Sequence, residues 1–263
     1  MQVIHIAEPT DPRLDVYRDV RERDLVGRQG LFVAEGEVVL RRLFSQSAHR
    51  PVSVLLAEKR LAKLAPALES LEHDVPVYIA PQAVMDAIVG FPIHRGILAV
   101  AQRAPDPDPA ELLARSRLVL ALVGIANHDN MGGLFRNAAA FGVDAVLLDA
   151  GCCDPMYRKA IRVSVGTALS VPFARLAAGS DLIGLLQGAG LEPLALSPAG
   201  DVQLSAVQPP QRAAVIVGPE GPGLPEALLA RSTTVSIPMA AGVDSLNVGV
   251  AAAVALHHLR FPG

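Results

Sequence analysis

The second half of the chain alternates short apolar runs with longer segments of mixed polarity. The apolar runs cover residues 118–123, 143–148, 171–174, 191–196, 214–217 and 235–237. Continuous apolar strands separated by helical segments are typical of a parallel sheet that helices cover on both faces. We therefore predict an α/β domain with a parallel sheet over residues 111–263.

The first hundred residues carry a shorter version of this alternation. Four β-type runs fall at 31–34, 52–56, 75–79 and 97–101, and helical patterns fall at 37–45, at 59–72 and just after Pro81. We predict a smaller α/β domain over residues 1–103, and its lack of a G-x-G-x-x-G loop argues against dinucleotide binding. The alternating prolines of A-P-D-P-D-P, within 104–110, predict a semi-rigid linker between the two domains.

The end of the chain places polar side chains at the entry of an apolar helix. The last apolar strand ends at Pro238, which cannot donate to a sheet ladder. We expect Asp244 or Ser245 to N-cap a helix over 246–259 that is rich in alanine and valine. One cap does not account for a second short polar side chain, Asn247, beside it.

Composition describes a globular chain with ample material for a core. Hydrophobic residues make up 51% of the 263 residues, and the mean hydropathy is +0.37. No apolar run reaches the ~18 residues of a membrane helix, and the first residues do not resemble a signal peptide. The adjacent cysteines Cys152 and Cys153 suit neither a disulfide framework nor a zinc site, so we expect a cytoplasmic protein without a metal.

The charge balance bears on nucleic-acid binding only in part. The formal net charge is −3 and the isoelectric point is near 6.2. Indiscriminate binding needs many cations that neutralise phosphates, which this chain lacks overall. A net charge of −3 is still compatible with a local basic patch that binds nucleic acid.

Three short motifs occur in order along the second domain. The first is N-M-G-G-L-F-R, from Asn130 to Arg136; the second is G-P-E-G-P-G at 218–223; the third is S-I-P-M at 236–239 followed by S-L-N-V at 245–248. Together they resemble the three motifs of the SpoU (TrmH-like) RNA methyltransferases, which belong to the SPOUT class. Their shared order and spacing make the resemblance much more specific than any one motif.

The resemblance implies a fold, a cofactor and an assembly. It implies a trefoil knot in the C-terminal domain, S-adenosylmethionine as cofactor and a homodimer. The F-V-A-E-G at 32–36 and R-G-I-L-A at 95–99 resemble, more loosely, the L30e-like substrate-binding domain of such enzymes. The implied reaction is methyl transfer to a ribose 2′-hydroxyl of RNA.

The resemblance also assigns residues to the site. The implied catalytic residues are Asn130, Arg136, Glu220, Ser245 and Asn247, and the implied cofactor-binding residues are Gly218, Ile237, Pro238, Met239 and Leu246. A guanidinium stays protonated well above neutral pH. We therefore expect Arg136 to orient the ribose and stabilise charge on its oxygen rather than to act as the base.

Basic residues in two stretches are candidates for RNA binding. They are Arg21, Arg23 and Arg28 in the first domain and Arg158, Lys159 and Arg162 in the second. Arginine forks suit phosphate geometry. The alternative is a solvated surface, because acidic residues interleave with the first group.

Other functions stay open at this level. We expect rRNA as the substrate rather than tRNA, by analogy of the first domain with a ribosomal protein. A tRNA ribose methyltransferase, a base methyltransferase and a non-catalytic RNA-binding protein on the same scaffold are the alternatives. The five polar residues of the implied catalytic set favour an enzyme, since a binder does not need them.

Overall fold

The computed structural model of the chain describes residues 2–18, 26, 30–89 and 96–261. The chain folds into two compact units, of which the first holds 1–105 and 155–170 and the second holds 106–154 and 171–263. The boundary near residue 105 falls inside the expected linker. The segment 155–170 differs from our expectation, because it packs with the first unit although it lies between two strands of the second unit in sequence.

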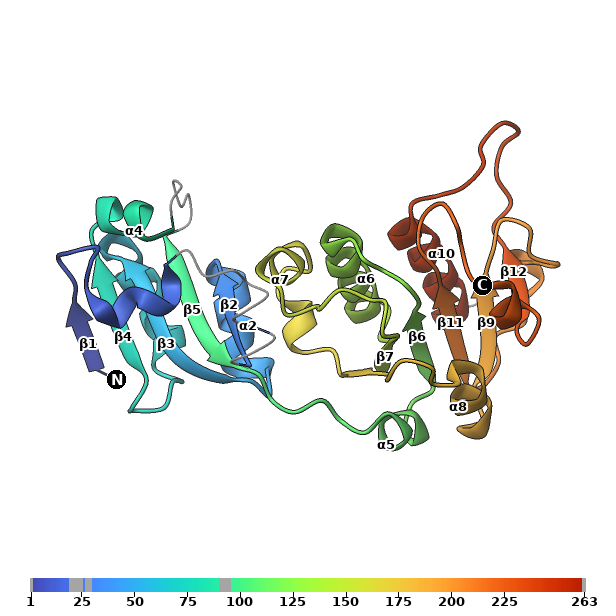
Figure 1. Cartoon of the computed structure of the whole chain (residues 1–263), viewed down its shortest axis with the longest axis horizontal. Helices are drawn as coiled ribbons and strands as arrows, with labels where there is room; N and C mark the ends of the chain where they lie inside the picture. Colours follow the sequence, from blue (N-terminus) through green and yellow to red (C-terminus); the bar gives the residue numbers. More distant parts are fainter. Residues whose placement is uncertain (1, 19–25, 27–29, 90–95, 262–263) are drawn as a thin grey trace. The chain divides into compact units, whose positions relative to one another are not determined.

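Within the described residues, the first unit is built on a mixed five-stranded sheet (Figure 1). In spatial order its strands are β1 (Gln2–His5), β4 (Pro76–Ala80), β3 (Arg50–Ala57), β5 (Ile97–Gln102) and β2 (Leu31–Glu35). β1, β4 and β3 run parallel, and β5 is antiparallel to both of its neighbours. The pattern predicted four of these strands, while β1 is an edge strand whose largely exposed residues give no signal.

Helical segments pack on this sheet and on each other. They are η1 (Pro12–Tyr17), α2 (Glu37–Gln46), η2 (Glu58–Arg60), α3 (Leu61–Leu68), α4 (Gln82–Val89), α7 (Arg158–Val163) and η3 (Thr167–Leu169). Leu55 of β3 is buried in one cluster with Leu14 of η1 and Met85 of α4. On α7, Ala160 and Ile161 are fully buried, which places this helix in the first unit against β2.

The second unit, as far as it is described, has a seven-stranded sheet in which all neighbouring strands run parallel. In spatial order its strands are β10 (Val202–Gln203), β12 (Thr233–Ser236), β9 (Glu192–Leu196), β11 (Ala213–Val217), β6 (Leu118–Leu122), β7 (Ala145–Leu148) and β8 (Phe173–Arg175). This confirms the parallel-sheet α/β prediction. The two-residue β10 is too short for an apolar run to reveal.

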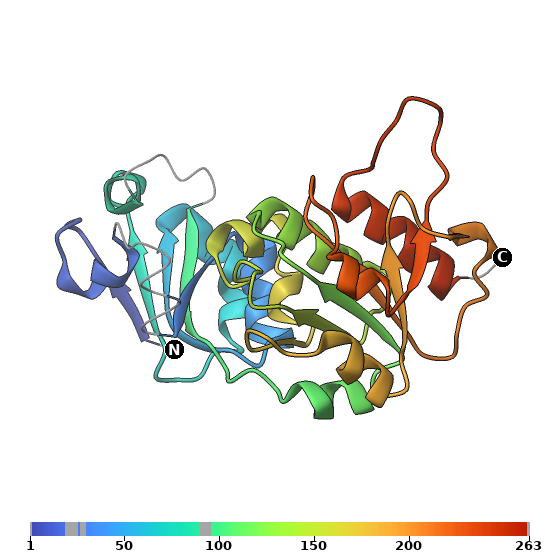
Figure 2. The same cartoon turned by 45° about the vertical axis from the view of Figure 1, so that its right-hand side comes forward.

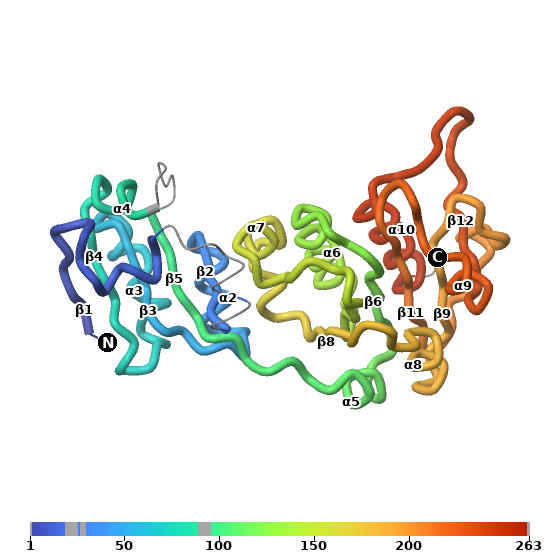
Figure 3. Tube along the Cα trace, in the orientation of Figure 1, coloured from blue at the N-terminus to red at the C-terminus, as the bar shows by residue number. Residues whose placement is uncertain are grey.

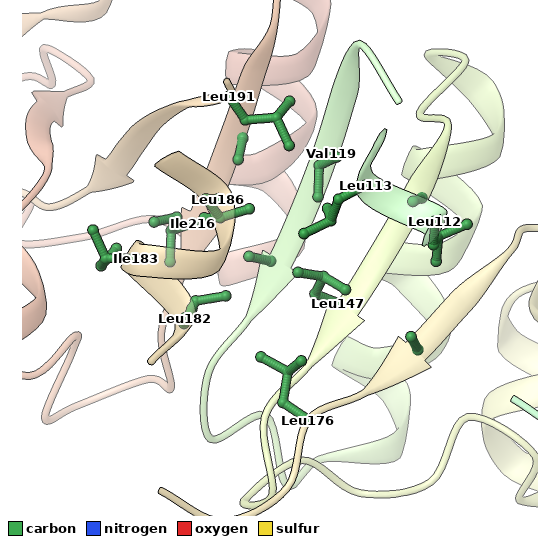
Figure 4. Packing of buried hydrophobic residues seen from close by; sticks show 14 of the residues in the cluster. Leu112, Leu113, Val119, Leu147, Leu176, Leu182, Ile183, Leu186, Leu191 and Ile216 are labelled. Carbon is green, nitrogen blue, oxygen red and sulfur yellow. The ribbon is translucent and has the colours of Figure 1, made fainter. Parts of the chain in front are cut away.

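Helices cover both faces of the second sheet. They are α5 (Pro109–Ala114), α6 (His128–Ala140), α8 (Leu182–Gly188), η4 (Leu204–Ala206), α9 (Glu226–Leu229) and α10 (Val248–Arg260). Leucines of α5 and α8 pack on alternate strand residues such as Val119 and Ile216 (Figure 4), because successive side chains of a strand point to opposite faces. α6 and α10 lie together on the other side of the strands (Figure 2). In the described ranges, each helix is too short or too polar to cross a bilayer.

The start of α10 corrects our prediction of its cap. Neither Asp244 nor Ser245 caps the helix; Asn247 does, and its Oδ1 accepts a hydrogen bond from the Gly249 amide at 2.9 Å. All three residue types make good caps, so local chemistry alone did not distinguish them. The choice follows from the partners that the Asn247 side chain finds elsewhere in the fold.

Candidate active site

Loops from four neighbouring strands meet at one edge of the second sheet. β12, β9, β11 and β6 are adjacent and parallel, so their carboxyl ends share that edge, where open α/β folds place ligands. The loop 237–247, between β12 and α10, projects away from the sheet (Figure 3). The first motif lies in α6, the helix that follows β6, and the other two occupy the loops after β11 and β12. This explains how residues distant in sequence come together.

A pocket of about 320 Å³ lies among these loops. Its lining is mainly apolar, with Val217, Ile237, Leu246 and Val248 contributing side chains. The remaining lining residues are Leu196, Ser197, Pro198, Gly218, Pro219, Glu220, Gly221, Gly223, Val235, Met239, Asp244, Ser245 and Ala251. Its volume and its mixture of apolar walls with a few polar groups suit a small organic ligand.

Three side chains, one from each motif, form a closed hydrogen-bonded triangle. Asn130 Nδ2 donates to Glu220 Oε1 at 3.1 Å, and Asn247 Nδ2 donates to the same oxygen at 2.8 Å. Asn247 Nδ2 also donates to Asn130 Oδ1 at 3.0 Å. Since Glu220 lines the pocket, the triangle forms part of its polar rim.

Caps at two helices place the two amides of this triangle. Asn127 accepts hydrogen bonds from the backbone amides of Asp129 and Asn130 and thereby starts α6. Asn247 starts α10 through its oxygen while its nitrogen faces Asn130 and Glu220. The orientation of the Asn247 amide is fixed because its oxygen already caps α10. The position of Asn130 is fixed because its backbone amide is bound at the start of α6.

The glycine at the start of the second motif allows the loop to fold back on itself. A Cβ atom at Gly218 would lie 2.9 Å from the backbone carbon of Gly223 and 2.9 Å from the Leu224 nitrogen. Such distances exclude a side chain unless the backbone shifts. Gly218 thus keeps the loop narrow and holds Glu220 at the pocket.

Most residues predicted to bind the cofactor line the pocket. Gly218, Ile237, Met239 and Leu246 do so, whereas Pro238 is absent from the lining. Pro238 lies between two lining residues, and alternate residues of an extended segment point to opposite sides. The prediction for Pro238 therefore has no support in the geometry.

The other two predicted catalytic residues stand apart from the triangle. Ser245 lines the pocket. Arg136 is exposed on α6, and within the described chain no hydrogen bond or ion pair holds its guanidinium. An arginine without an internal partner is available for a phosphate or a ribose oxygen.

The predicted RNA-binding residues divide into two groups. Arg21, Arg23 and Arg28 lie outside the described residues. Arg158, Lys159 and Arg162 lie on α7 in the first unit, not in the unit that carries the pocket. Arg158 comes within 4.0 Å of the carboxylate of Glu35, a residue that is only 8% exposed.

Sequence reasoning missed several residues of this region. Ser197 and Asp244 line the pocket, and Asn137 Nδ2 donates to the Gly249 carbonyl at 2.6 Å. The Asp149 carboxylate accepts the amides of Gly124 and Gly151 at 3.0 Å each, which fixes the loop after β6. Ser197 and Asp149 each directly follow an apolar run in the sequence. That position at the end of a predicted strand was the signal that could have identified them as site residues.

The two cysteines are packing residues in this loop region. Burial raises the pKa of Cys152 to about 12 and that of Cys153 to about 11. Cys152 Sγ donates to the Leu122 carbonyl at 3.2 Å, and both thiols are free. Across the described residues, no group of three or more His, Cys, Asp or Glu is arranged to hold a metal ion.

Comparison with known proteins places this geometry in a family. A sequence model of the SpoU rRNA Methylase family matches residues 117–257. A protein of Mycobacterium bovis named as an uncharacterized tRNA/rRNA methyltransferase is 41% identical over 266 residues, covering 98% of this chain and 91% of that one. The 23S rRNA (guanosine(2553)-2′-O)-methyltransferase RlmP of Bacillus subtilis is 29% identical over 72% of this chain and 75% of its own length.

Solved structures share the whole architecture. An AdoMet-bound rRNA methyltransferase from Sinorhizobium meliloti superposes with a TM-score of 0.85 at 20% identity, over 99% of this chain and 98% of that one. An RNA 2′-O ribose methyltransferase superposes with a TM-score of 0.78 at 25% identity, over 97% and 98%. The family match over most of the second unit, together with the close relative over nearly the full length, establishes that this chain belongs to the SpoU rRNA methylase family.

Proposed function

We propose that this chain transfers a methyl group from S-adenosylmethionine to a ribose 2′-hydroxyl in RNA. The triangle of Asn130, Glu220 and Asn247 at the rim of an apolar pocket carries the proposal. It gathers one residue from each of three motifs at the ligand-binding edge of a parallel sheet. Membership of the SpoU family supports the same reaction.

The pocket suits the proposed cofactor. The walls formed by Val217, Ile237 and Leu246 fit a flat adenine ring, and the backbone near Gly218 can approach it closely. Two carboxylates in the lining suit a ligand that carries positive charge. When bound, S-adenosylmethionine supplies a methyl group on a sulfonium, which is reactive without a metal.

Arg136 acts on the RNA side of the reaction. Its free guanidinium orients the ribose and stabilises negative charge on the 2′-oxygen while the C–O bond forms and the C–S bond breaks. The hydroxyl proton passes to water. Asn130, Glu220, Ser245 and Asn247 hold the pocket rim in one arrangement, so that alignment of the 2′-oxygen with the methyl group provides most of the acceleration.

Ribosomal RNA is the proposed substrate. RlmP, which acts on 23S rRNA by its name, supports this choice, although other relatives are named for tRNA and rRNA together. The first unit is proposed as an L30e-like RNA-binding domain, with Arg21, Arg23, Arg28, Arg158, Lys159 and Arg162 as contacts. The two free cysteines suit a cytoplasmic enzyme.

A trefoil knot and a homodimer complete the proposal. After β12 has paired with β9 and β10, α10 returns to pack on α6 and β11, and this return of the chain supports the proposed crossing. The outer side of α10 exposes Val250 and Val254 at 49% and 41%. An exposed apolar stripe on a helix favours a symmetric contact with a second copy.

Methyl transfer with purified components tests the proposal. The protein, S-adenosylmethionine and either protein-free rRNA or tRNA are incubated with a chelator present, and digested RNA is analysed for 2′-O-methylated nucleosides. We expect methylation of rRNA, with Glu220→Ala as an inactive control. Binding of the cofactor without methylation of either RNA would favour the non-catalytic alternative, and methylated bases would point to a base methyltransferase.

A further inference from the structure

The charged side chains that line the pocket are all acidic. Among the described residues, its lining includes the carboxylates of Glu220 and Asp244 and contains no lysine, arginine or histidine. Two negative charges on the walls of a cleft attract positive ligands and disfavour negative ones. The pocket therefore distinguishes ligands by charge as well as by shape.

The two carboxylates differ in what they already bind. Glu220 Oε1 accepts hydrogen bonds from Asn130 and Asn247, so part of its charge is engaged in the triangle. Asp244 has neither a hydrogen bond nor an ion pair to any part of the chain that the structure describes. Its carboxylate is available to a ligand.

The loop of Asp244 presents this carboxylate over the pocket. The Val243 amide donates to the Ala240 carbonyl at 3.2 Å, which closes a turn, and Gly242 has a φ of 85° that glycine tolerates best. Asp244 follows this turn directly and lines the pocket next to Ser245 and Leu246. Asp244 is exposed to solvent and also lines the pocket, so the turn leaves its carboxylate accessible to a ligand there.

We propose that Asp244 is a specificity-determining residue that favours the methyl donor over its demethylated product. This inference rests on the function proposed above. S-adenosylmethionine carries a positive sulfonium, whereas S-adenosylhomocysteine has a neutral thioether at the same position. Asp244 stabilises the sulfonium form and loses that interaction once the methyl group has left, so the product is released more readily.

An alternative role for Asp244 makes a different prediction. The amino acid part of the cofactor has an ammonium group that is present both before and after transfer. If Asp244 binds that ammonium group, removal of the Asp244 carboxylate lowers the affinities for the methyl donor and for the product equally. Only a contribution at the sulfonium changes the ratio of the two affinities.

Calorimetry on the full chain separates these roles. Three ligands are titrated into the wild type, Asp244→Asn and Asp244→Glu: S-adenosylmethionine, S-adenosylhomocysteine and sinefungin, whose protonated amine replaces the sulfonium. In Asp244→Asn we expect the affinities for the two cationic ligands to fall about three- to fivefold, the size of one partly exposed ion pair. The affinity of Asp244→Asn for S-adenosylhomocysteine should stay unchanged, which shows that the variant is folded. Asp244→Glu should keep most of the preference for the cationic ligands over S-adenosylhomocysteine.

Salt and a matched acid provide the controls. The wild-type preference for the cationic ligands should decrease as ionic strength rises, and that of Asp244→Asn should not. Glu226→Gln removes an exposed carboxylate of α9 that does not line the pocket and should leave the preference intact. An equal loss for all three ligands in Asp244→Asn, or no loss, overturns this inference alone, whereas a wild type that binds none of them overturns the proposed function.

Discussion

The side-chain amide of Asn137 on α6 donates a hydrogen bond to the backbone carbonyl of Gly249 on α10, across 2.6 Å. Asn137 follows Arg136, and Gly249 lies two residues after Asn247. A Cβ atom at Gly249 would be 3.8 Å from Asn137 Nδ2, an ordinary contact, but only 3.1 Å from Asn247 Oδ1, so a side chain there would crowd the cap of α10. Together with the bond from Asn247 to Asn130, this bond connects α6, which carries Arg136, to the start of α10.

Replacement of Asn137 should loosen the site and lower stability together. Asn137→Ala removes a half-buried hydrogen bond, and we expect the free energy of unfolding to fall by about 1 kcal/mol, with a lower rate of methyl transfer. Asn137→Asp should be worse than alanine, because a carboxylate oxygen would oppose the Gly249 carbonyl. Urea denaturation and initial rates measure both effects; an alanine variant with wild-type values would show that the bond positions nothing.

Arg136 should be essential for transfer and dispensable for the cofactor. For Arg136→Ala we expect a loss of rate of about 10²-fold or more, the range for removing one group that stabilises a developing oxyanion, with unchanged affinity for S-adenosylmethionine. Arg136→Lys should also fail largely, since a point charge does not reproduce the fork. Arg117→Ala, an exposed arginine before β6, is the matched control. A fully active lysine variant would contradict the orienting role.

The exposed side of α10 should form the homodimer interface. Ala252 and Ala255 are fully buried within their own subunit, so substitutions of those alanines would test packing rather than assembly. Val254→Glu is the better change, and we expect a folded monomer with weaker cofactor binding. Val52→Glu, at a valine 42% exposed against 41% for Val254, should leave the dimer intact. Sedimentation velocity decides, and an active wild-type monomer at micromolar concentration would disprove the interface.

Cys152 should make stability fall at alkaline pH. Burial raises the pKa of its thiol from 9.0 to about 12, so the folded state keeps the thiol neutral while the unfolded chain ionises it above pH 9. The stabilising effect is complete below pH 9 and is lost as the pH rises toward 12. Cys152→Ser should therefore show a shallower decline in the free energy of unfolding over this range. Burial also raises the pKa of Tyr17, but Tyr17 contributes equally to the wild type and to Cys152→Ser. If the free energy of unfolding falls with pH equally steeply in both proteins, Cys152 is not the cause of the decline.

The sequence alone determined most strands of both sheets and the loops that carry the site. Apolar runs long enough to cross a core become buried strands wherever they occur, and motifs placed just after such runs must reach the carboxyl edge of a parallel sheet. The resemblance to the SpoU motifs assigned Glu220 and Asn247 to one site, and their positions after apolar strands agree with that assignment. Strands of this kind can be predicted from the sequence because their apolar pattern involves only residues that are neighbours along the chain.

Tertiary structure decided the features that depend on partners far along the chain. Asn247 rather than Asp244 or Ser245 caps α10 because only its amide also reaches Glu220 and Asn130, which lie 27 and 117 residues away. α7 packs in the first unit because Ala160 and Ile161 are buried there, although the chain on either side of it belongs to the second sheet. Asn137 gave no signal of its own, since its partner is a backbone carbonyl that any residue possesses. Hydrogen bonds and packing contacts reach only a few ångströms. Which distant residues come that close depends on how the strands and helices are arranged in the fold, and local sequence patterns do not contain this information.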